Sequence, residues 1–98
     1  MSKKAILCID DELDILDNLT TQLLEEFGGK YEIEKAESAE EAFEVIEELL
    51  IDGIKTIIII TDWLMPGMKG DTFLEEVHKK FPEVVKIMLS GYADEKAV

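Results

Sequence analysis

Short, mostly apolar runs along the chain predict β-strands. They cover residues 5–9, residues 57–60, which are four consecutive isoleucines, and residues 84–89. The isoleucine run is too short for a helix or a membrane span, and its β-branched side chains favour an extended backbone. A strand that is apolar on both faces is typical of a parallel sheet. Residues 31–36 alternate apolar with acidic side chains, which predicts a half-exposed edge strand.

Between the first three strands, apolar positions recur at helical spacing and predict two helices. The first covers residues 12–27 and stops at Gly28-Gly29, which suits a left-handed cap. The second starts with the capping-box spacing of Ser38 and Glu41, and it ends at Gly53. The apolar positions are Leu13, Leu16, Leu23 and Phe27 in the first helix, and Ala39, Ala42, Phe43, Ile46, Leu49 and Leu50 in the second.

A third helix is predicted from about Asp71 to Phe81, and Pro82 prevents its continuation. Its inward-facing positions are Phe73, Leu74, Val77 and Phe81. Strands that alternate with helices imply right-handed βαβ units, hence an α/β fold with a parallel sheet and helices on both faces. Residues 93–98 predict the first turn of another helix, so the organisation is (βα)₄, cut inside the last helix.

The composition narrows the class of partner. With 98 residues, 47% hydrophobic and 34% charged, the chain is predicted to form one globular domain, residues 1–98. Its formal charge of -13 argues against direct binding to nucleic acid or to an anionic membrane. Cys8 is the single cysteine and lies in an apolar run, which predicts a buried thiol and fits a reducing cytoplasm.

Acidic residues follow two of the predicted strands directly. Asp10 and Asp11 come after the first strand, and Asp62 comes after the isoleucine run. If these strands are neighbours, three carboxylates meet in one crevice, and the ion that would neutralise them best is Mg²⁺. Ser90 follows the last strand and could donate a hydrogen bond to a phosphoryl oxygen. A carboxylate nucleophile, a metal site and a hydroxyl donor are the parts of acyl-phosphate chemistry.

Three segments carry a resemblance to a known family. IDDE after the first strand, TDWLMPGMKG after the third and LSGYAD after the fourth resemble the response-regulator receiver domain, in order and in spacing. The pattern Asp-x-x-Met-Pro-x-Met-x-Gly from Asp62 to Gly70 makes the match specific. The resemblance implies a flavodoxin-like receiver fold and a role in a two-component phosphorelay, with a histidine kinase or a phosphotransfer protein as partner.

The resemblance also implies a role for each site residue. Asp62 would accept a phosphoryl group and become an aspartyl phosphate. Asp11 would bind Mg²⁺ directly and Asp10 through water, and the backbone carbonyl of Leu64 would be a further ligand. Ser90 would be the switch hydroxyl that moves toward the phosphoryl group. The chain would then be a signalling phosphoacceptor rather than an enzyme, limited to its own phosphorylation and dephosphorylation.

The sequence departs from the family after the fourth strand. Receiver domains continue with a fifth strand, which ends in a lysine that pairs with the phosphoryl group, and with a fifth helix. Lys86 and Lys96 do not match that position. Without that lysine, phosphorylation should be weaker or absent. Without the fifth helix, one apolar face of the sheet should stay exposed to solvent. Either the natural chain is longer, which we favour, or a second copy covers the face in a homodimer formed through the exposed sheet edge.

Other interpretations remain open at this stage. The main alternative is a receiver-like module that takes no phosphate and acts through protein contacts, and a small hydrolase that releases phosphate repeatedly is a third class. Asp10 and Asp11 could cap the first helix as well as bind an ion, and Ser90 could be an ordinary strand-end hydroxyl. His78 is interpreted as a solvated helix residue. Neither a calcium loop nor a P-loop pattern is present.

Overall fold

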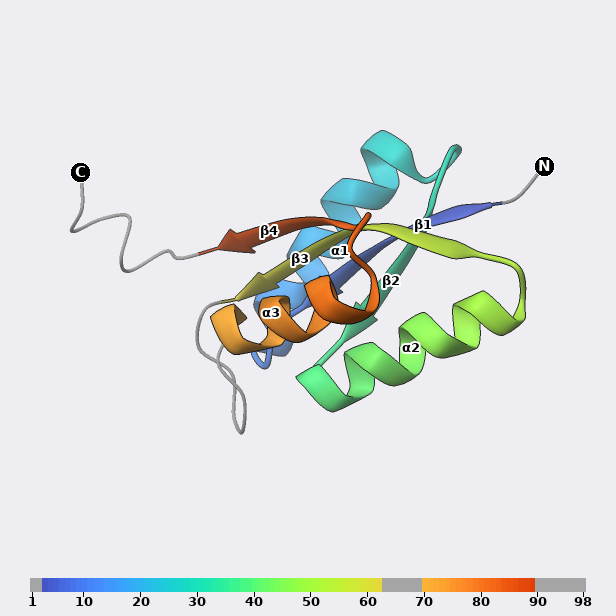
Figure 1. The fold of residues 1–98 in the computed structure, drawn as a ribbon. Helices are drawn as coiled ribbons and strands as arrows, with labels where there is room; N and C mark the ends of the chain where they lie inside the picture. The colour runs from blue at the N-terminus through green and yellow to red at the C-terminus, as the bar shows by residue number, and fades with distance from the viewer. Residues whose placement is uncertain (1–2, 63–69, 90–98) are drawn as a thin grey trace.

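The computed structural model describes residues 3–62 and 70–89, and these residues form one parallel sheet flanked by helices (Figure 1). The strand order is β2-β1-β3-β4, and each neighbouring pair is parallel. The elements are β1 Lys4–Ile9, α1 Leu13–Phe27, β2 Glu32–Ala36, α2 Ala39–Ile51, β3 Lys55–Asp62, α3 Gly70–Lys80 and β4 Val85–Leu89. The predicted α/β architecture is therefore confirmed for the part of the chain that is described.

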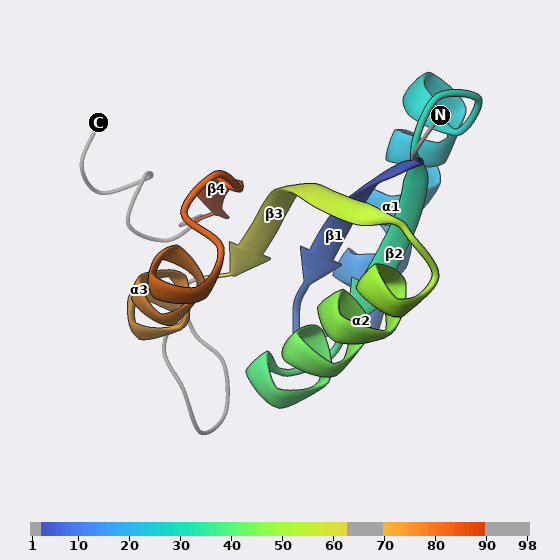
Figure 2. The same ribbon diagram turned by 45° about the vertical axis from the view of Figure 1, so that its right-hand side comes forward.

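Helices cover both faces of the sheet (Figure 2). Successive residues of β1 point to opposite faces, so Leu7 packs with the α2 and α3 side and Cys8 packs with the α1 side. Both residues are fully buried. The α2 and α3 side also buries Ile9, Ile46, Ile59, Phe73 and Val77, and the α1 side also buries Ile6, Leu16 and Ile60. Both faces of the central strands therefore carry buried residues, as the apolar runs predicted, although Ile57 and Ile58 of β3 are only half-buried.

The first helix differs from its prediction at both ends. Leu13 and Phe27 lie at its first and last residues and are 51% and 41% exposed, because the terminal turns extend past the buried contacts that Leu16 makes with the sheet. Thr20 is buried instead, and its hydroxyl donates to the Leu16 carbonyl oxygen at 2.9 Å. The spacing of apolar residues does not predict a polar residue such as Thr20 on the inner face of a helix.

The predicted left-handed cap at Gly28-Gly29 is wrong. Gly28 has φ −62° and continues the right-handed turn, with its amide donating to the Leu24 carbonyl oxygen at 2.9 Å. A Cβ at Gly28 would lie 2.5 Å from that same oxygen. The glycine is therefore required by a close backbone approach, and the left-handed conformation plays no part in it.

The predicted caps of the second helix are confirmed. Ser38 Oγ accepts from the Glu41 amide at 3.1 Å, and the Glu41 carboxylate accepts from the Glu37 amide at 3.2 Å. At the other end Gly53 has φ 80°, the one positive φ among the described residues. The Gly53 amide donates to the Leu50 carbonyl, and the Ile54 amide donates to the Leu49 carbonyl, as in a Schellman motif. Leu50, predicted on the apolar face, is 46% exposed.

The third helix packs against the second through aromatic rings. Phe73 is fully buried, and its ring centroid lies 5.2 Å from that of Phe43. Val77 is also fully buried, and Phe81 follows the helix and packs against the same cluster. None of the helices in the described part of the chain is long and apolar enough to span a membrane.

The α1 side of the sheet is incompletely covered beside β4. Val85 pairs with Ile58 and Ile87 pairs with Ile60, so these side chains continue the apolar row on the α1 side. Val85 is 55% exposed and Ile87 is 42% exposed. Within the described residues, the apolar surface beside the fourth strand is therefore exposed to solvent, as expected.

Candidate functional site

Asp10 is a buried acid held in place from two directions. It follows the last residue of β1 and is only 4% exposed. Its amide donates to the Ala36 carbonyl at 3.2 Å, which extends the contact between β1 and β2 by one residue. Its carboxylate oxygen Oδ1 accepts from the Glu12 amide at 2.9 Å. The position of Asp10 is therefore set both by the sheet and by the turn that leads into α1.

The sheet register brings Asp10 next to Asp62. Strands β1 and β3 are paired neighbours, with Ile9 opposite Thr61, so the next residue along each strand is Asp10 on one and Asp62 on the other. Neighbouring strands lie about 4.8 Å apart. Asp62 ends β3 and pairs with Leu89 of β4. The condition that the sequence left open, adjacency of the first and third strands, is met.

Asp11 lies in the exposed turn between β1 and α1. Glu12 is the N-cap residue of the helix and makes no capping bond through its side chain, whereas Asp10 binds the Glu12 amide. Acidic residues at this position are favoured by the positive end of the helix dipole. The expected capping role and the expected site role of the Asp10-Asp11 pair are therefore compatible.

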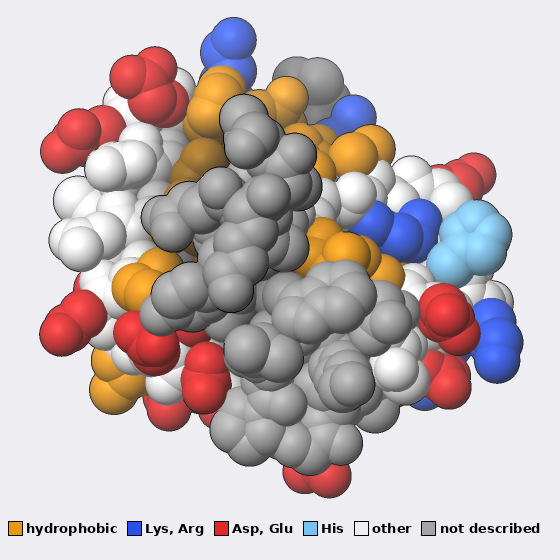
Figure 3. Space-filling model, turned by 90° about the vertical axis from the view of Figure 1, so that its left-hand side faces the viewer, with side chains coloured by type: hydrophobic (Ala, Val, Ile, Leu, Met, Phe, Trp, Pro, Cys, Tyr) orange, Lys and Arg blue, Asp and Glu red, His pale blue; other side chains and the backbone are white. Residues whose placement is uncertain are grey.

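The rest of the predicted site lies outside the described residues. This applies to the Asp62 side chain, to the Leu64 carbonyl and to the Ser90 hydroxyl, so their roles stay predictions. Among the side chains that are described, no group of three or more His, Cys, Asp or Glu is placed to hold a metal ion. Figure 3 views the molecule from the side toward which β3 and β4 point, and acidic side chains lie around its margin.

Three further residues behave as the sequence predicted. Lys86 lies within β4, and its ammonium group donates to the Val84 carbonyl, 2.6 Å away, so it does not replace a strand-end lysine. His78 is exposed on α3. Cys8 is fully buried, and burial raises the pKa of its thiol to about 11, which keeps it protonated and unreactive at neutral pH.

An open parallel sheet with acids at the carboxyl ends of two adjacent strands is typical of a flavodoxin-like α/β domain, and such domains generally bind ligands at that edge. Residues 6–98 match the family model described as the response regulator receiver domain. The chain belongs to this family.

Individual relatives agree with this assignment. Hydrogenase transcriptional regulatory protein HoxA of Cupriavidus necator is 34% identical over 93 residues, which are 95% of this chain and 17% of that protein. The crystal structure of a response regulator receiver domain protein from Clostridium thermocellum has a TM-score of 0.75 at 35% identity, covering 96% of this chain and 70% of that one. The solution structure of the beryllofluoride-activated NtrC4 receiver domain dimer has a TM-score of 0.73 at 31% identity, covering 90% and 66%. The chain therefore spans a small part of the length of HoxA and about two thirds of the length of the two solved receiver domains.

Proposed function

We propose that residues 1–98 act as a phosphoacceptor receiver unit of a cytoplasmic two-component phosphorelay, with Asp62 as the phosphoacceptor. The parallel pairing of β1 with β3 carries this proposal, because it aligns Asp62 with the buried acid Asp10 at one sheet edge. The donor would be a histidine kinase or a phosphotransfer protein. Phosphorylation would switch the protein contacts of the domain, with Ser90 as the switch hydroxyl.

The chemical step moves a phosphoryl group from a histidine nitrogen of the donor to a carboxylate oxygen of Asp62. An Asp62 carboxylate oxygen attacks the phosphorus of a phosphohistidine, the new O–P bond forms as the N–P bond breaks, and the imidazole leaves with the bonding electrons and takes up a proton. The product is an acyl phosphate on Asp62. Each chain accepts one phosphoryl group and is itself the product, so it acts as a signalling phosphoacceptor rather than as an enzyme that turns over.

Repulsion between negative charges at this sheet edge opposes the reaction. Asp10 is buried, and the incoming phosphoryl group adds further charge close to it. Hard carboxylate oxygens are the donors that magnesium prefers, and the Glu12 amide already holds the Asp10 carboxylate in one orientation. A magnesium ion held by Asp11 and Asp62, by Asp10 through water and by the Leu64 carbonyl would supply positive charge to the phosphoryl oxygens.

Acetyl phosphate provides a direct test without a known kinase. The chain is incubated with acetyl phosphate and Mg²⁺, and the intact mass is measured before and after treatment with hydroxylamine, which cleaves acyl phosphates. We expect the gain of one phosphoryl group, its loss with hydroxylamine, and no gain in Asp62→Ala. Asp52→Ala is the matched control, since Asp52 is an acid at the C-cap of α2.

The same experiment separates the competing functions. A chain that stays unmodified with acetyl phosphate and does not bind beryllofluoride would contradict the phosphoacceptor role and favour a receiver-like interaction module. Release of many phosphates per chain would indicate a hydrolase. Modification that persists in Asp62→Ala would place the acceptor on another residue.

A further inference from the structure

The two edge strands of the sheet differ in how they are protected. Among the described strands, β2 and β4 each pair on one side only (Figure 1). An unpaired edge presents backbone amides and carbonyls that can pair with another strand, and charged side chains on the edge usually discourage this. Strand β2, EIEKA, carries three charged residues in five, whereas β4, VKIML, carries one, Lys86. The edge at β4 is therefore the less protected of the two.

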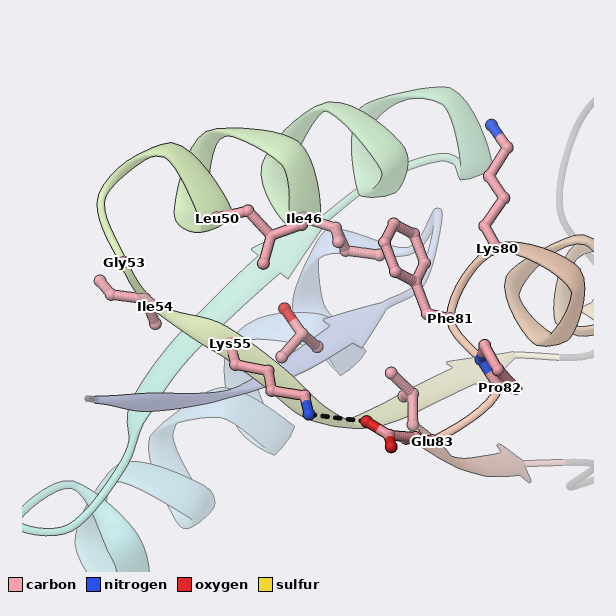
Figure 4. A pocket seen from close by; sticks show the side chains of 11 residues that line it. Ile46, Leu50, Gly53, Ile54, Lys55, Lys80, Phe81, Pro82 and Glu83 are labelled. Carbon is pink, nitrogen blue, oxygen red and sulfur yellow. Dashed lines mark hydrogen bonds and ion pairs between the residues drawn. The ribbon is translucent and has the colours of Figure 1, made fainter. Parts of the chain in front are cut away.

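The charges in and beside β4 are engaged by contacts within the chain. Lys86 pairs with Ile59, whose side chain belongs to the core on the α2 and α3 side, so Lys86 lies on that face of the sheet. Lys86 is half-buried, and its ammonium group donates to the Val84 carbonyl at 2.6 Å. The acid just before the strand, Glu83, lies 2.8 Å from the Lys55 ammonium (Figure 4). These charges are therefore held near the start of β4.

Apolar side chains are accessible on both faces of β4. On the α1 side, Val85 is 55% exposed and Ile87 is 42% exposed. On the other face, the half-buried Met88 lines a groove beside α3. A helix packed on one face would cover only one of these surfaces, whereas an added strand contacts side chains on both faces and also pairs with the backbone edge. The partner that fits this edge is therefore a β-strand with apolar residues on both faces.

Strand β4 is itself such a strand, and it is complementary to its own two-fold copy. In an antiparallel pair, side chains directly opposite each other lie on the same face, and a two-fold axis perpendicular to the sheet keeps the α1 faces of both copies on one side. One register uses all five residues of β4. It places Ile87 opposite Ile87 on the axis, Val85 opposite Leu89, and Lys86 opposite Met88. No like charges are opposed in this register.

The same arrangement is unfavourable at the other edge. Antiparallel pairing over all five residues of β2 places Glu34 opposite Glu34 on the axis, and like charges directly opposite each other are destabilising. The chain has a formal charge of -13, so a second copy is repelled wherever acids meet acids. Of the two described edges, β4 is the one that avoids this repulsion.

Helix α3 provides charge complementarity beside the β4 edge. Glu75 and Lys79 lie one turn apart on α3, both are exposed, and both line the groove that contains Met88. The two-fold axis beside Met88 places the α3 helices of the two copies antiparallel on the same face of the joined sheet. The acidic position of each helix then lies across from the basic position of the other, and the contact occurs twice because the interface is symmetric.

We propose that the chain forms a symmetric homodimer in which β4 pairs antiparallel with β4 of a second copy, with the two-fold axis at Ile87. The two sheets become one continuous sheet, and Glu75 of each copy faces Lys79 of the other. The unprotected edge, the matching register and the opposite charges on α3 support the second copy as the partner. The proposal does not depend on phosphorylation of Asp62.

Sedimentation velocity on the 98-residue chain measures the association. We expect a reversible dimer with a Kd of about 100 µM or below, as for a weak, small interface. Ile87→Lys places two lysines on the axis and should raise Kd at least about 10-fold. Ile51→Lys is the matched control, because Ile51 is an 84% exposed residue at the end of α2 and should leave Kd unchanged. Circular dichroism checks that both variants are folded.

A charge exchange tests the contacts between the α3 helices. Glu75→Lys and Lys79→Glu each oppose like charges in both symmetric contacts, so each variant alone should dimerise about 3- to 10-fold more weakly. An equimolar mixture of the two variants restores opposite charges in both contacts of the heterodimer. The mixture should therefore associate as tightly as the unchanged chain. Its total charge equals that of two unchanged chains, which excludes an effect of net charge.

Disulfide crosslinking tests the register. Two residues opposite each other on the axis have Cα atoms about 4.5–5.5 Å apart, within the range of a disulfide, so Ile87→Cys should crosslink under mild oxidation. Val85→Cys should not, because the two copies of this position lie about 14 Å apart along the strands. The native Cys8 is fully buried and gives both variants the same background.

Specific outcomes would overturn the dimer. They are a chain that stays monomeric up to about 1 mM, tenfold above the expected Kd, equal weakening by Ile51→Lys and Ile87→Lys, and a mixture of the α3 variants that associates no better than its components. Crosslinking of Val85→Cys as efficient as that of Ile87→Cys would contradict the axis at Ile87. None of these measurements involves Asp62, so phosphorylation is tested separately.

Discussion

The Asp10 carboxylate accepts a 2.9 Å hydrogen bond from the amide of Glu12, the N-cap residue of α1. This bond links a buried acid at the sheet edge to the start of the helix. A single side chain therefore contributes to the start of a helix and to the proposed ion site. The two contributions can be separated, because the first needs only an oxygen acceptor and the second needs negative charge.

Substitution of Asp10 should reveal both contributions. Asp10→Ala should lower the free energy of unfolding by about 1 kcal/mol, because the Glu12 amide loses its acceptor, whereas Asp10→Asn should cost less. Both variants should weaken Mg²⁺ binding, followed by the fluorescence of Trp63, the single tryptophan, next to Asp62 in the sequence. Urea unfolding gives the stability. Unchanged Mg²⁺ affinity in Asp10→Asn would contradict the proposed role of the Asp10 charge.

Two leucines of α1 should differ sharply in what they contribute to stability. Leu16 is fully buried against the sheet and Leu13 is 51% exposed. Leu16→Ala should cost about 2–4 kcal/mol through lost burial and the cavity left behind, and Leu13→Ala should cost less than about 1 kcal/mol. Similar losses in the two variants, measured by chemical denaturation, would show that the described packing of α1 is wrong.

The left-handed turn after α2 should make Gly53 sensitive to substitution. Gly53 has φ 80°, and Gly53→Ala should cost about 1–2 kcal/mol because a Cβ is strained in that region. Gly29→Ala is the matched control: a Cβ there meets nothing within 4 Å, and the change should stay within about 0.5 kcal/mol. Thermal unfolding of both variants tests the difference. A neutral Gly53→Ala would contradict the Schellman cap.

Glu34 should make stability depend on pH. Burial, and secondarily the charge of Glu32, raises the pKa of Glu34 above 4.5. The folded state then binds this proton more tightly than the unfolded state does, so the penalty is absent below pH 4.5, grows as pH rises through the folded pKa, and is complete above it. Glu34→Gln should therefore stabilise the protein at pH 7 by less than about 1 kcal/mol, since solvent screens the side chain.

The control for Glu34 must remove the effect of net charge. Glu47→Gln lowers the overall negative charge equally from an exposed position on α2. The gain in Glu34→Gln should exceed that in Glu47→Gln at pH 7, and the two should converge below pH 4.5. Equal gains at both pH values would show that the local environment of Glu34 contributes nothing beyond charge.

The sequence alone determined the elements, both caps of α2 and the family. Local periodicity is sufficient for these features, because the spacing of apolar residues records which side of an element is covered, and Ser38, Glu41 and Gly53 act within one turn of the backbone. The run from Asp62 to Gly70 makes the resemblance specific at the level of sequence, and the match over residues 6–98 confirms the family.

Only the tertiary structure decided what those elements touch. The adjacency of Asp10 and Asp62 follows from pairing between β1 and β3, which are separated by two helices and a strand in the sequence. The exposure of Leu13 and the β-bulge at Ile57, where Ala5 pairs with Thr56 and Ile6 pairs with Ile58, also depend on neighbours outside the local pattern. A periodic sequence encodes which face is buried, whereas the partner of that face and the register against it are set by packing between distant segments.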